Sequence, residues 1–313
     1  MDIDAITLAD LQVFGGSDRQ DGVLSLFLDT HSESGLAKLR QRLRAPLSDV
    51  DELEAVQAAV KYFAEVWEGP IPAMGSLDDF EKYLNSRLEV RQHRPLLGDL
   101  VDSLWLRIAQ GDVCGELRYG VHLALKLIAD SGSLAQELLG SDPPPRLRSL
   151  AETILVECEP FRDARTGSSV LASIRLDRLL RGDHLTHLKA LADCLAEIDL
   201  LWAMGATTRH HAWVFPELIR GDRFMAEGTG LCHPVLPRAV PNDVAVAVDE
   251  PVMFLTGPNM AGKTTYLRSV GLAVLLGQLG MGVPAQRFRL APAEVLLTSL
   301  NPTDNLQAGI SYY

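Results

Sequence analysis

The sequence predicts a multidomain protein in which an all-α domain, residues 1–205, precedes part of an α/β domain, residues 206–313. Two observations predict this division. Up to about residue 205, apolar residues recur every three or four positions, and almost no alternating strand pattern occurs. After that point, short apolar runs alternate with turn residues, and one of these runs leads into a glycine-rich loop.

Helical spacing of apolar residues predicts the elements of the first domain. Helices are expected within residues 6–31 as two short pieces, and then at 33–45, 48–68, 77–92, 96–140 and 170–204. Pro46 ends one of them, and Ser48 with Asp51 has the spacing of a capping box that opens the next. Residues 147–158 fit either a helix or a strand, and an interruption of the last helix is expected near Gly182.

The second domain shows short apolar runs bounded by turn residues, which are typical of strands. Strands are expected at residues 213–216, 244–248, 251–256, 287–290 and 295–300. The segment that follows the glycine-rich loop is expected to be a helix. Its expected core residues are Tyr266, Leu267, Val270, Val274, Leu275 and Leu279.

The composition is that of a folded, acidic protein. Of 313 residues, 47% are hydrophobic and 22% are charged, and the net charge is −12. This balance excludes a general nucleic-acid-binding surface, so DNA contacts would come from a local basic patch or from parts outside this chain. Two basic clusters are interpreted as solvated helix faces, with phosphate binding as the alternative. They are Lys38, Arg40, Arg42 and Arg44, and Arg87, Arg91, His93 and Arg94.

Disulfide, metal and membrane chemistry have little support in the sequence. The widely spaced cysteines are expected to be reduced thiols in a cytoplasmic protein: Cys114, Cys158, Cys194 and Cys232. Two histidine pairs without a completing ligand are interpreted as surface residues: His184 with His187, and His210 with His211. The N-terminus has no signal-peptide pattern and no apolar stretch reaches membrane-spanning length, so no membrane partner is expected.

The glycine-rich loop has the Gly-x-x-x-x-Gly-Lys-Thr pattern of a phosphate-binding loop. Gly257 and Gly262 permit a backbone that points N–H groups at phosphate oxygens. The Lys263 ammonium can reach the β- and γ-phosphates of a nucleotide, and the Thr264 hydroxyl can bind Mg²⁺. ATP and Mg²⁺ are therefore the expected ligands, and a chance match in a turn is the alternative. The expected binding residues here are Gly257, Pro258, Asn259, Met260, Ala261, Gly262, Lys263, Thr264 and Thr265.

The amino-acid sequence of this loop resembles that of one family in particular. Residues 256–268 read Thr-Gly-Pro-Asn-Met-Ala-Gly-Lys-Thr-Thr-Tyr-Leu-Arg, which is similar to the ATPase of the MutS family of DNA mismatch-repair proteins. Most phosphate-binding loops share only the glycines and the lysine, so Pro258, Asn259 and Met260 make the match specific. The resemblance implies a helical core and lever domain followed by an ABC-class ATPase domain. It also implies ATP hydrolysis coupled to the binding of duplex DNA through a homodimer.

Further segments extend the resemblance. Similar elements occur at residues 195–199, 230–234, 240–243, 283–285 and 301–311. The match is strongest over residues 8–60 and 230–311 and is thin over residues 70–190. It therefore runs, discontinuously, over nearly the whole chain.

The resemblance also implies roles for single residues. Asn259 is the expected catalytic contact to the γ-phosphate or the attacking water. Ser311 is expected to reach the γ-phosphate held by the other subunit, with a plain loop serine as the alternative. Val240 is expected to give adenine an apolar contact, because Ala239 stands where many members carry a stacking aromatic residue. His233 is interpreted as fixing a turn, with a catalytic base as the alternative.

Departures from the family pattern limit the expected activity. The family's mismatch-recognition and connector domains would precede Met1, and its Walker B strand with the catalytic carboxylates would follow Tyr313. Residues 70–190 are also short for a full lever and clamp. We therefore expect a piece of a longer ATPase that binds nucleotide weakly and hydrolyses little of it alone. Brisk hydrolysis that depends on Lys263 would contradict this expectation.

The sequence thus predicts a MutS-like ATP-binding protein that acts in DNA repair. Two alternatives remain, which are a DNA-handling ATPase without mismatch recognition and a non-catalytic helical dimerisation scaffold. A mispair that leaves the affinity for duplex DNA unchanged at fixed salt would favour the first. Behaviour that is untouched by Lys263→Ala would favour the second.

Overall fold

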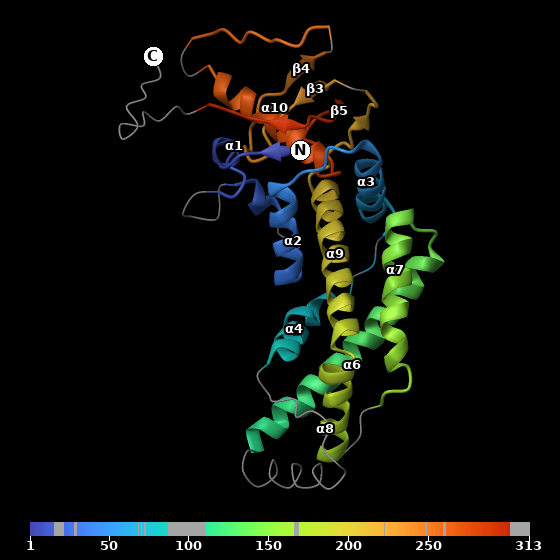
Figure 1. Cartoon of the computed structure of the whole chain (residues 1–313). Coiled ribbons are helices and arrows are strands. Elements are labelled where there is room, and N and C mark those ends of the chain that lie inside the picture. Colours follow the sequence, from blue (N-terminus) through green and yellow to red (C-terminus); the bar gives the residue numbers. More distant parts are fainter. Residues whose placement is uncertain are drawn as a thin grey trace. The chain divides into compact units, whose positions relative to one another are not determined.

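The computed structural model of the chain is mainly helical, with two small sheets among the residues that it describes (Figure 1). It describes residues 1–15, 22–27, 30–67, 69, 71, 73–86, 111–165, 169–221, 223–247, 249–258 and 261–300, without the side chains of 111–114. Two compact units make up the chain. The first comprises Met1–Thr30, Ala37–Trp67 and Leu201–Tyr313, and the second comprises His31–Leu36 and Glu68–Leu200. The domain boundary predicted at residue 205 stays a prediction.

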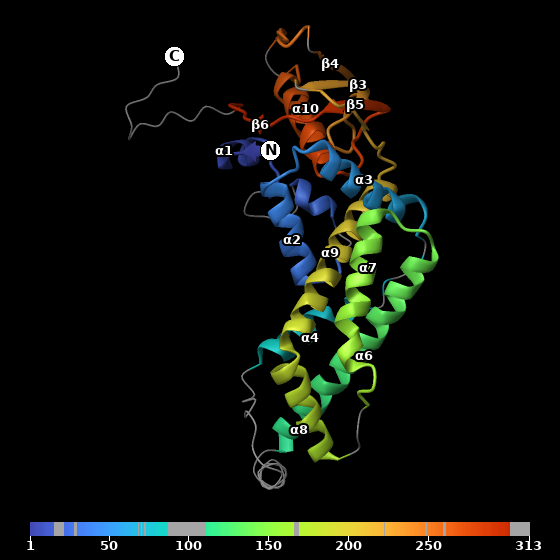
Figure 2. The same ribbon diagram turned by 45° about the vertical axis from the view of Figure 1, so that its right-hand side comes forward.

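The second unit is built around the long helix α6, Gly111–Gly140. Three helices contact it, namely α4 (Leu77–Asn85), α7 (Pro145–Cys158) and α8 (Val170–Arg178). Figure 2 shows α7 running beside α6. One face of α6 is buried at Ala124, Leu127, Ala135 and Leu138. Gaps of three and eight residues place these positions on one face of a helix, and such spacing is the signal that predicts a helix here.

Two sequence ambiguities in this unit are resolved by the structure. Residues 147–158 belong to the helix α7, which starts at Pro145, a position where the missing N–H of proline has no cost. The predicted interruption near Gly182 is a short π-helical stretch, Leu179–Asp183, between α8 and α9 (Leu185–His210). The parts of the helices predicted at 77–92 and 96–140 that span 87–110 lie outside the described residues.

The first unit combines helices with both sheets. Its helical elements are α1 (Ala5–Asp10), the 3₁₀ turn Val23–Leu26, α3 (Val50–Glu65), α10 (Lys263–Gln278) and most of α2 (Glu33–Arg44). The C-terminal end of α9 belongs to this unit as well. All of these helices were expected from sequence, because their apolar residues have helical spacing.

The start of α3 differs from the sequence prediction. The side chain of Asp49 accepts a hydrogen bond from the Glu52 N–H at 2.8 Å, so Asp49 is the N-cap. The predicted capping box begins one residue earlier, at Ser48. Aspartate and serine cap helices about equally well, so spacing alone could not separate the two positions.

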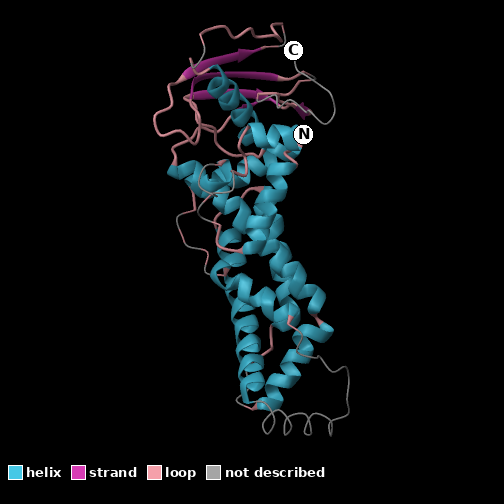
Figure 3. Ribbon diagram, turned by 90° about the vertical axis from the view of Figure 1, so that its left-hand side faces the viewer, coloured by secondary structure: helices cyan, strands magenta, loops and turns pink. Residues whose placement is uncertain are grey.

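A four-stranded sheet has the order β2-β5-β3-β4. Its strands are β2 (Glu217–Leu218), β3 (Met225–Leu231), β4 (Asn242–Val246) and β5 (Arg287–Ala291). β3 is antiparallel to both β4 and β5, and β2 is parallel to β5. A second pair joins β1 (Asp2–Ile3) in parallel to β6 (Val295–Leu296). Figure 3 shows these strands close together beside helices of the same unit.

Two of the five predicted strands are wrong, and a third is much shorter than expected. Residues 213–216 contribute only an isolated bridge from Val214 to Val283. Residues 251–256 are not a strand, and the side chain of Phe254 is 90% exposed. The strand predicted at 295–300 is limited to β6. An apolar run becomes a strand only when a neighbouring strand supplies hydrogen-bond partners, and the described residues place none beside 251–256.

The helix α10 contacts β3 and anchors the region around the glycine-rich loop (Figure 1). Its C-terminal half is buried, including Val274 and Leu275, as is Leu279 just after it. Gln278 is also buried, and its amide bonds the backbone of Leu47 and Ala293. The predicted core role of Leu267 is wrong, because this side chain is 42% exposed. The loop end of the helix therefore faces solvent, while its other end is fixed in the core.

No helix among the described residues is long and apolar enough to cross a membrane.

Candidate nucleotide-binding site

The glycine-rich loop passes into α10 through backbone conformations that glycine adopts freely. Gly262 is the N-cap of α10 and has a φ of 87°, in the left-handed region. A Cβ there would meet no atom within 4 Å, so backbone conformation and not space requires glycine. The first bond of the helix runs from the Tyr266 N–H to the Gly262 carbonyl at 2.9 Å. The N–H groups of Lys263 to Thr265 come before this first bond and so have no partner within the helix. They lie at the N-terminal end of α10, which favours negative charge.

The Lys263 side chain turns back over the loop. Its ammonium donates hydrogen bonds to the carbonyl oxygens of Gly257 and Pro258, both at 2.7 Å. The Ala261 N–H donates to the Pro258 carbonyl at 3.3 Å, which closes the described part of the loop. A positive charge held over a helix N-terminus suits an anion such as a phosphate group, so the residues present fit the nucleotide phosphates predicted from sequence.

The two threonines of the motif differ in their surroundings. Thr264 is exposed at the start of α10, where its hydroxyl can act as an oxygen ligand for a hard cation. Thr265 is partly buried, and its carbonyl accepts a hydrogen bond from the Ser269 hydroxyl at 2.9 Å. Thr264 therefore fits the predicted Mg²⁺ ligand by its chemistry and exposure.

Tyr266 joins three segments around this site. Its hydroxyl donates to the backbone carbonyl of Asp243 at 2.9 Å, at the start of β4, and lies 3.6 Å from the Met253 sulfur. Burial foremost, and then the charge of Asp243, raises the pKa of Tyr266. The sequence analysis placed Tyr266 in the helix core and missed these contacts. The available signal was the hydroxyl itself, which seeks a partner when a tyrosine is partly buried.

The loop before β4 carries the residue predicted to contact adenine. Val240 is 76% exposed, and its carbonyl accepts a hydrogen bond from the Asn242 side-chain amide at 2.9 Å. The Asp243 carboxylate accepts from the Gly230 N–H at 3.0 Å, which ties the loop to β3. An exposed apolar side chain on a loop held in this way can cover one face of a base, and this role of Val240 stays a prediction.

His233 stabilises the turn after β3. Its side chain is buried, and its Nδ1 accepts a 3.4 Å hydrogen bond from the Val235 N–H, which assigns the proton to Nε2. Burial first, and then the positive charge of Arg268, lowers the pKa of His233. These contacts agree with the interpretation of His233 as a turn-fixing residue.

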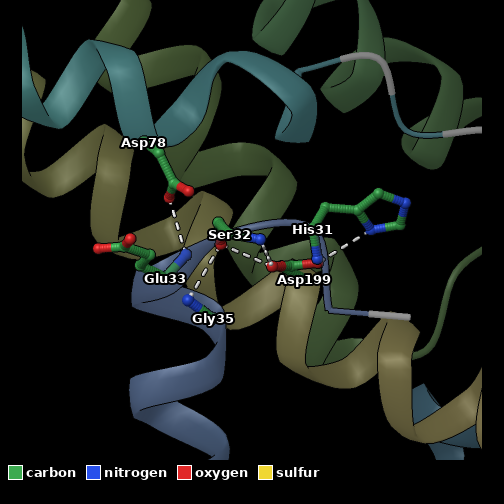
Figure 4. A network of polar contacts seen from close by, with 6 residues as sticks. All are labelled: His31, Ser32, Glu33, Gly35, Asp78 and Asp199. Atoms are coloured by element: carbon green, nitrogen blue, oxygen red, sulfur yellow. Dashed lines mark hydrogen bonds and ion pairs between the residues drawn. The ribbon is translucent and has the colours of Figure 1, made fainter. Parts of the chain in front are cut away.

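In the second unit, Asp199 on α9 forms a buried polar network (Figure 4). Its carboxylate accepts hydrogen bonds from the N–H groups of His31 and Ser32, at 3.1 and 3.0 Å, and from the Ser32 hydroxyl at 2.6 Å. The Ser32 oxygen in turn accepts from the Gly35 N–H at 3.0 Å. A Cβ at Gly35 would overlap the Asp199 carboxylate, so only glycine permits this approach.

A second carboxylate supports the same helix start. The Asp78 side chain accepts a hydrogen bond from the Glu33 N–H at 2.7 Å (Figure 4). Acceptors at the first turn of α2 satisfy N–H groups that have no partner within the helix. Asp199 lies in the segment 195–199, which the sequence analysis singled out by resemblance, but the network was not predicted because its partners are distant in sequence.

Other sequence predictions have mixed outcomes. Asn259, Met260 and Ser311 lie outside the described residues, so the two predicted catalytic positions stay predictions. No group of three or more metal-ligating side chains occurs within the described part of the chain. His187 nevertheless has a carboxylate partner, since its Nδ1 lies 2.7 Å from an oxygen of Glu157.

Comparisons with known proteins agree with the motif. Residues 253–313 match the family model "MutS domain V". Three relatives are each named DNA mismatch repair protein MutS. That of Halalkalibacterium halodurans is 36% identical over 137 residues, which cover 42% of this chain and 16% of that protein. That of Chlorobium phaeobacteroides is 36% identical over 142 residues, 43% of this chain and 16% of that protein.

The protein of Chlorobaculum parvum is 32% identical over 178 residues, which cover 54% of this chain and 19% of the relative. The aligned part of this chain therefore spans less than a fifth of the length of each of these curated relatives. The matched family segment contains the glycine-rich loop and the whole of α10. The family model and the named relatives therefore agree that part of this chain is similar to MutS proteins.

Proposed function

We propose that this chain binds ATP at the start of α10. One observation carries the proposal, namely the Lys263 ammonium held on the carbonyls of Gly257 and Pro258 above a helix that begins at a left-handed glycine. The loop offers backbone N–H groups and one ammonium group at the same point, and triphosphates are bound by this combination.

Several residues of the loop have a part in the proposed site. A phosphate would replace the two carbonyls as the partner of Lys263, and the N–H groups of residues 263–265 would donate to its oxygens. The Thr264 hydroxyl would hold Mg²⁺, which neutralises phosphate charge when bound. Asn259 would orient the γ-phosphate or the attacking water through its amide.

The biological role we propose is DNA mismatch repair, which the names of the relatives state for those proteins. In this role, ATP binding and hydrolysis would be coupled to the handling of duplex DNA through paired ATPase domains. Ser311 would act on the nucleotide held by the partner subunit. Two subunits sharing a nucleotide would make dimerisation depend on ATP, because the ligand stabilises the paired state.

Nucleotide binding by a Lys263→Ala variant tests the first proposal. We expect titration calorimetry with a slowly hydrolysed ATP analogue and Mg²⁺ to show binding that Lys263→Ala weakens at least about tenfold, because a charge-assisted contact to phosphate is lost. The matched control is Lys189→Ala, an exposed lysine of α9 in the other unit. Equal affinities for the two variants would contradict ATP binding at this loop.

Duplex binding at fixed salt tests the DNA role. The affinities for matched and mispaired duplexes are compared at one ionic strength, because phosphate contacts make every DNA affinity depend on salt. Binding of both duplexes with equal affinity would favour a DNA-handling ATPase without mismatch recognition. Binding of neither, with a dimer that is insensitive to ATP, would favour a helical scaffold.

A further inference from the structure

The hydroxyl of Tyr266 makes contacts that the proposed phosphate site does not use. Tyr266 lies in the first turn of α10, since its N–H makes the first bond of that helix, to Gly262. Its hydroxyl contacts the carbonyl of Asp243 and the sulfur of Met253. One side chain thus connects the phosphate-binding helix, the start of β4 and the segment that leads into the glycine-rich loop.

The loop that Tyr266 contacts is also held from its other side. The carboxylate of Asp243 accepts from the Gly230 N–H at 3.0 Å, and the Asn242 amide bonds the Val240 carbonyl at 2.9 Å. The backbone at 240–243 therefore has fixed attachments to β3, to α10 and within itself. All four residues of this segment are exposed, and the large apolar side chain among them is Val240, which is 76% exposed.

We propose that Tyr266 determines how the nucleotide base is bound, by fixing the Val240 loop at a set distance from the phosphate-binding end of α10. This inference rests on the proposed nucleotide site. The phosphates would occupy the helix start, and the exposed Val240 would cover one face of the base. Tyr266 touches neither part of the ligand and acts as a positioning residue. It keeps the two ends of the site at a fixed separation through its hydrogen bond to the Asp243 backbone carbonyl. Because the acceptor is backbone, a change of the Asp243 side chain does not remove it.

Two ligands separate this role from a role in phosphate binding. ATP has a base and phosphates, whereas inorganic tripolyphosphate has phosphates alone. We expect Tyr266→Phe to weaken ATP binding about three- to tenfold, as expected for one lost hydrogen bond, and to leave tripolyphosphate binding unchanged. The matched control is Tyr119→Phe, whose parent side chain is 61% exposed on α6 in the other unit and should affect neither ligand.

A double-mutant cycle tests whether Tyr266 acts through Val240. We expect Val240→Ala to weaken ATP but not tripolyphosphate, and we expect the double variant to lose less than the sum of the two single losses. Thermal melting of each variant checks that the chain remains folded. If Tyr266→Phe fails to fold, Val240→Ala alone still decides, since equal ATP affinity in that variant and the parent would overturn the inference.

The possible outcomes distinguish this inference from the proposal on which it rests. A parent chain that binds neither ligand would refute the nucleotide site itself. A parent chain that binds both ligands, with equal losses for both in Tyr266→Phe, would place Tyr266 in the phosphate cradle and overturn the inference. No loss for either ligand would overturn it as well. Selective loss of ATP binding, with non-additive effects in the cycle, would support it.

Discussion

Arg181 and Asp177 form a buried ion pair in the second unit, with the Arg181 Nε 2.7 Å from one carboxylate oxygen and an outer nitrogen 2.9 Å from the other. The pair bridges α8 and the π-helical stretch after it. Tyr83 donates to the same carboxylate at 2.8 Å, and Arg181 also donates to the hydroxyl and carbonyl of Ser86. Burial foremost, and then the charge of Asp177, raises the pKa of Tyr83.

Removal of one partner of this ion pair should destabilise the folded chain. We expect Asp177→Ala to lower the free energy of unfolding by about 3–5 kcal/mol, because it leaves the Arg181 charge buried without a counter-ion. Urea denaturation would measure the loss. The matched control is Glu65→Ala, which breaks the exposed pair with Lys61 on α3 and should have little measurable effect. Similar losses in the two variants would contradict the assigned role of the buried pair.

The stability contributed by the Asp199 network should depend on the negative charge of the Asp199 carboxylate. We expect Asp199→Asn to lower the free energy of unfolding by at least about 2 kcal/mol, because an amide replaces one acceptor oxygen that bonds His31 or Ser32 with a donor. Asp183→Asn, at an exposed position, serves as the control and should be neutral. Chemical denaturation of both variants measures the difference. A neutral Asp199→Asn would show that the carboxylate charge contributes nothing to the network.

His233 should make the stability of the first unit sensitive to acid. The pKa of His233 is lowered below 6.5 in the folded chain, so the unfolded chain takes up the proton first as the pH falls. Stability from this group is therefore complete above about pH 6.5. It decreases below that pH until the folded pKa is passed. We expect His233→Gln to show a shallower loss over this window in melts at stepped pH, and His122→Gln on α6 to retain the parent slope.

The exposed hydroxyl of Thr264 should matter only when a divalent cation is present. We expect Thr264→Val to weaken ATP binding several-fold in Mg²⁺ and to leave it unchanged in a chelator, because valine keeps the shape but loses the oxygen ligand. Thr264→Ser should restore the Mg²⁺ dependence. Calorimetric titrations with and without the metal measure the effect, and an equal loss under both conditions would refute a metal role for this residue.

Local sequence patterns predicted most of the helices and the phosphate-binding motif. The features that the sequence did not predict depend mostly on residues that are distant in sequence. The helices α2, α3 and α10 have apolar spacing that depends only on their own residues. The strand predicted at 251–256 failed because strand formation requires a neighbour that the described residues do not supply. The N-cap at Asp49 was displaced by one residue, since two adjacent side chains could both cap.

The candidate site shows the same limit. The glycines, Lys263 and Thr264 follow from a pattern of eight residues, and the structure adds the bonds of Lys263 to the loop carbonyls. The contact of Tyr266 with Asp243 joins residues 23 positions apart, and apolar spacing alone placed Tyr266 in the core. Sequence periodicity records which face of a helix is apolar, but not which polar atom a tyrosine on that face will reach.

Gln278 has a consequence for motion within the first unit. Its side chain bonds Leu47 on one side and Ala293 on the other, from a position without solvent exposure. The end of α10 that carries Lys263 lies four turns away and faces solvent. A ligand that binds at the Lys263 end would therefore move that end more than the Gln278 end, so that α10 tilts about Gln278 instead of translating. Amide hydrogen exchange in α10 would be fastest near Lys263 and slowest near Gln278.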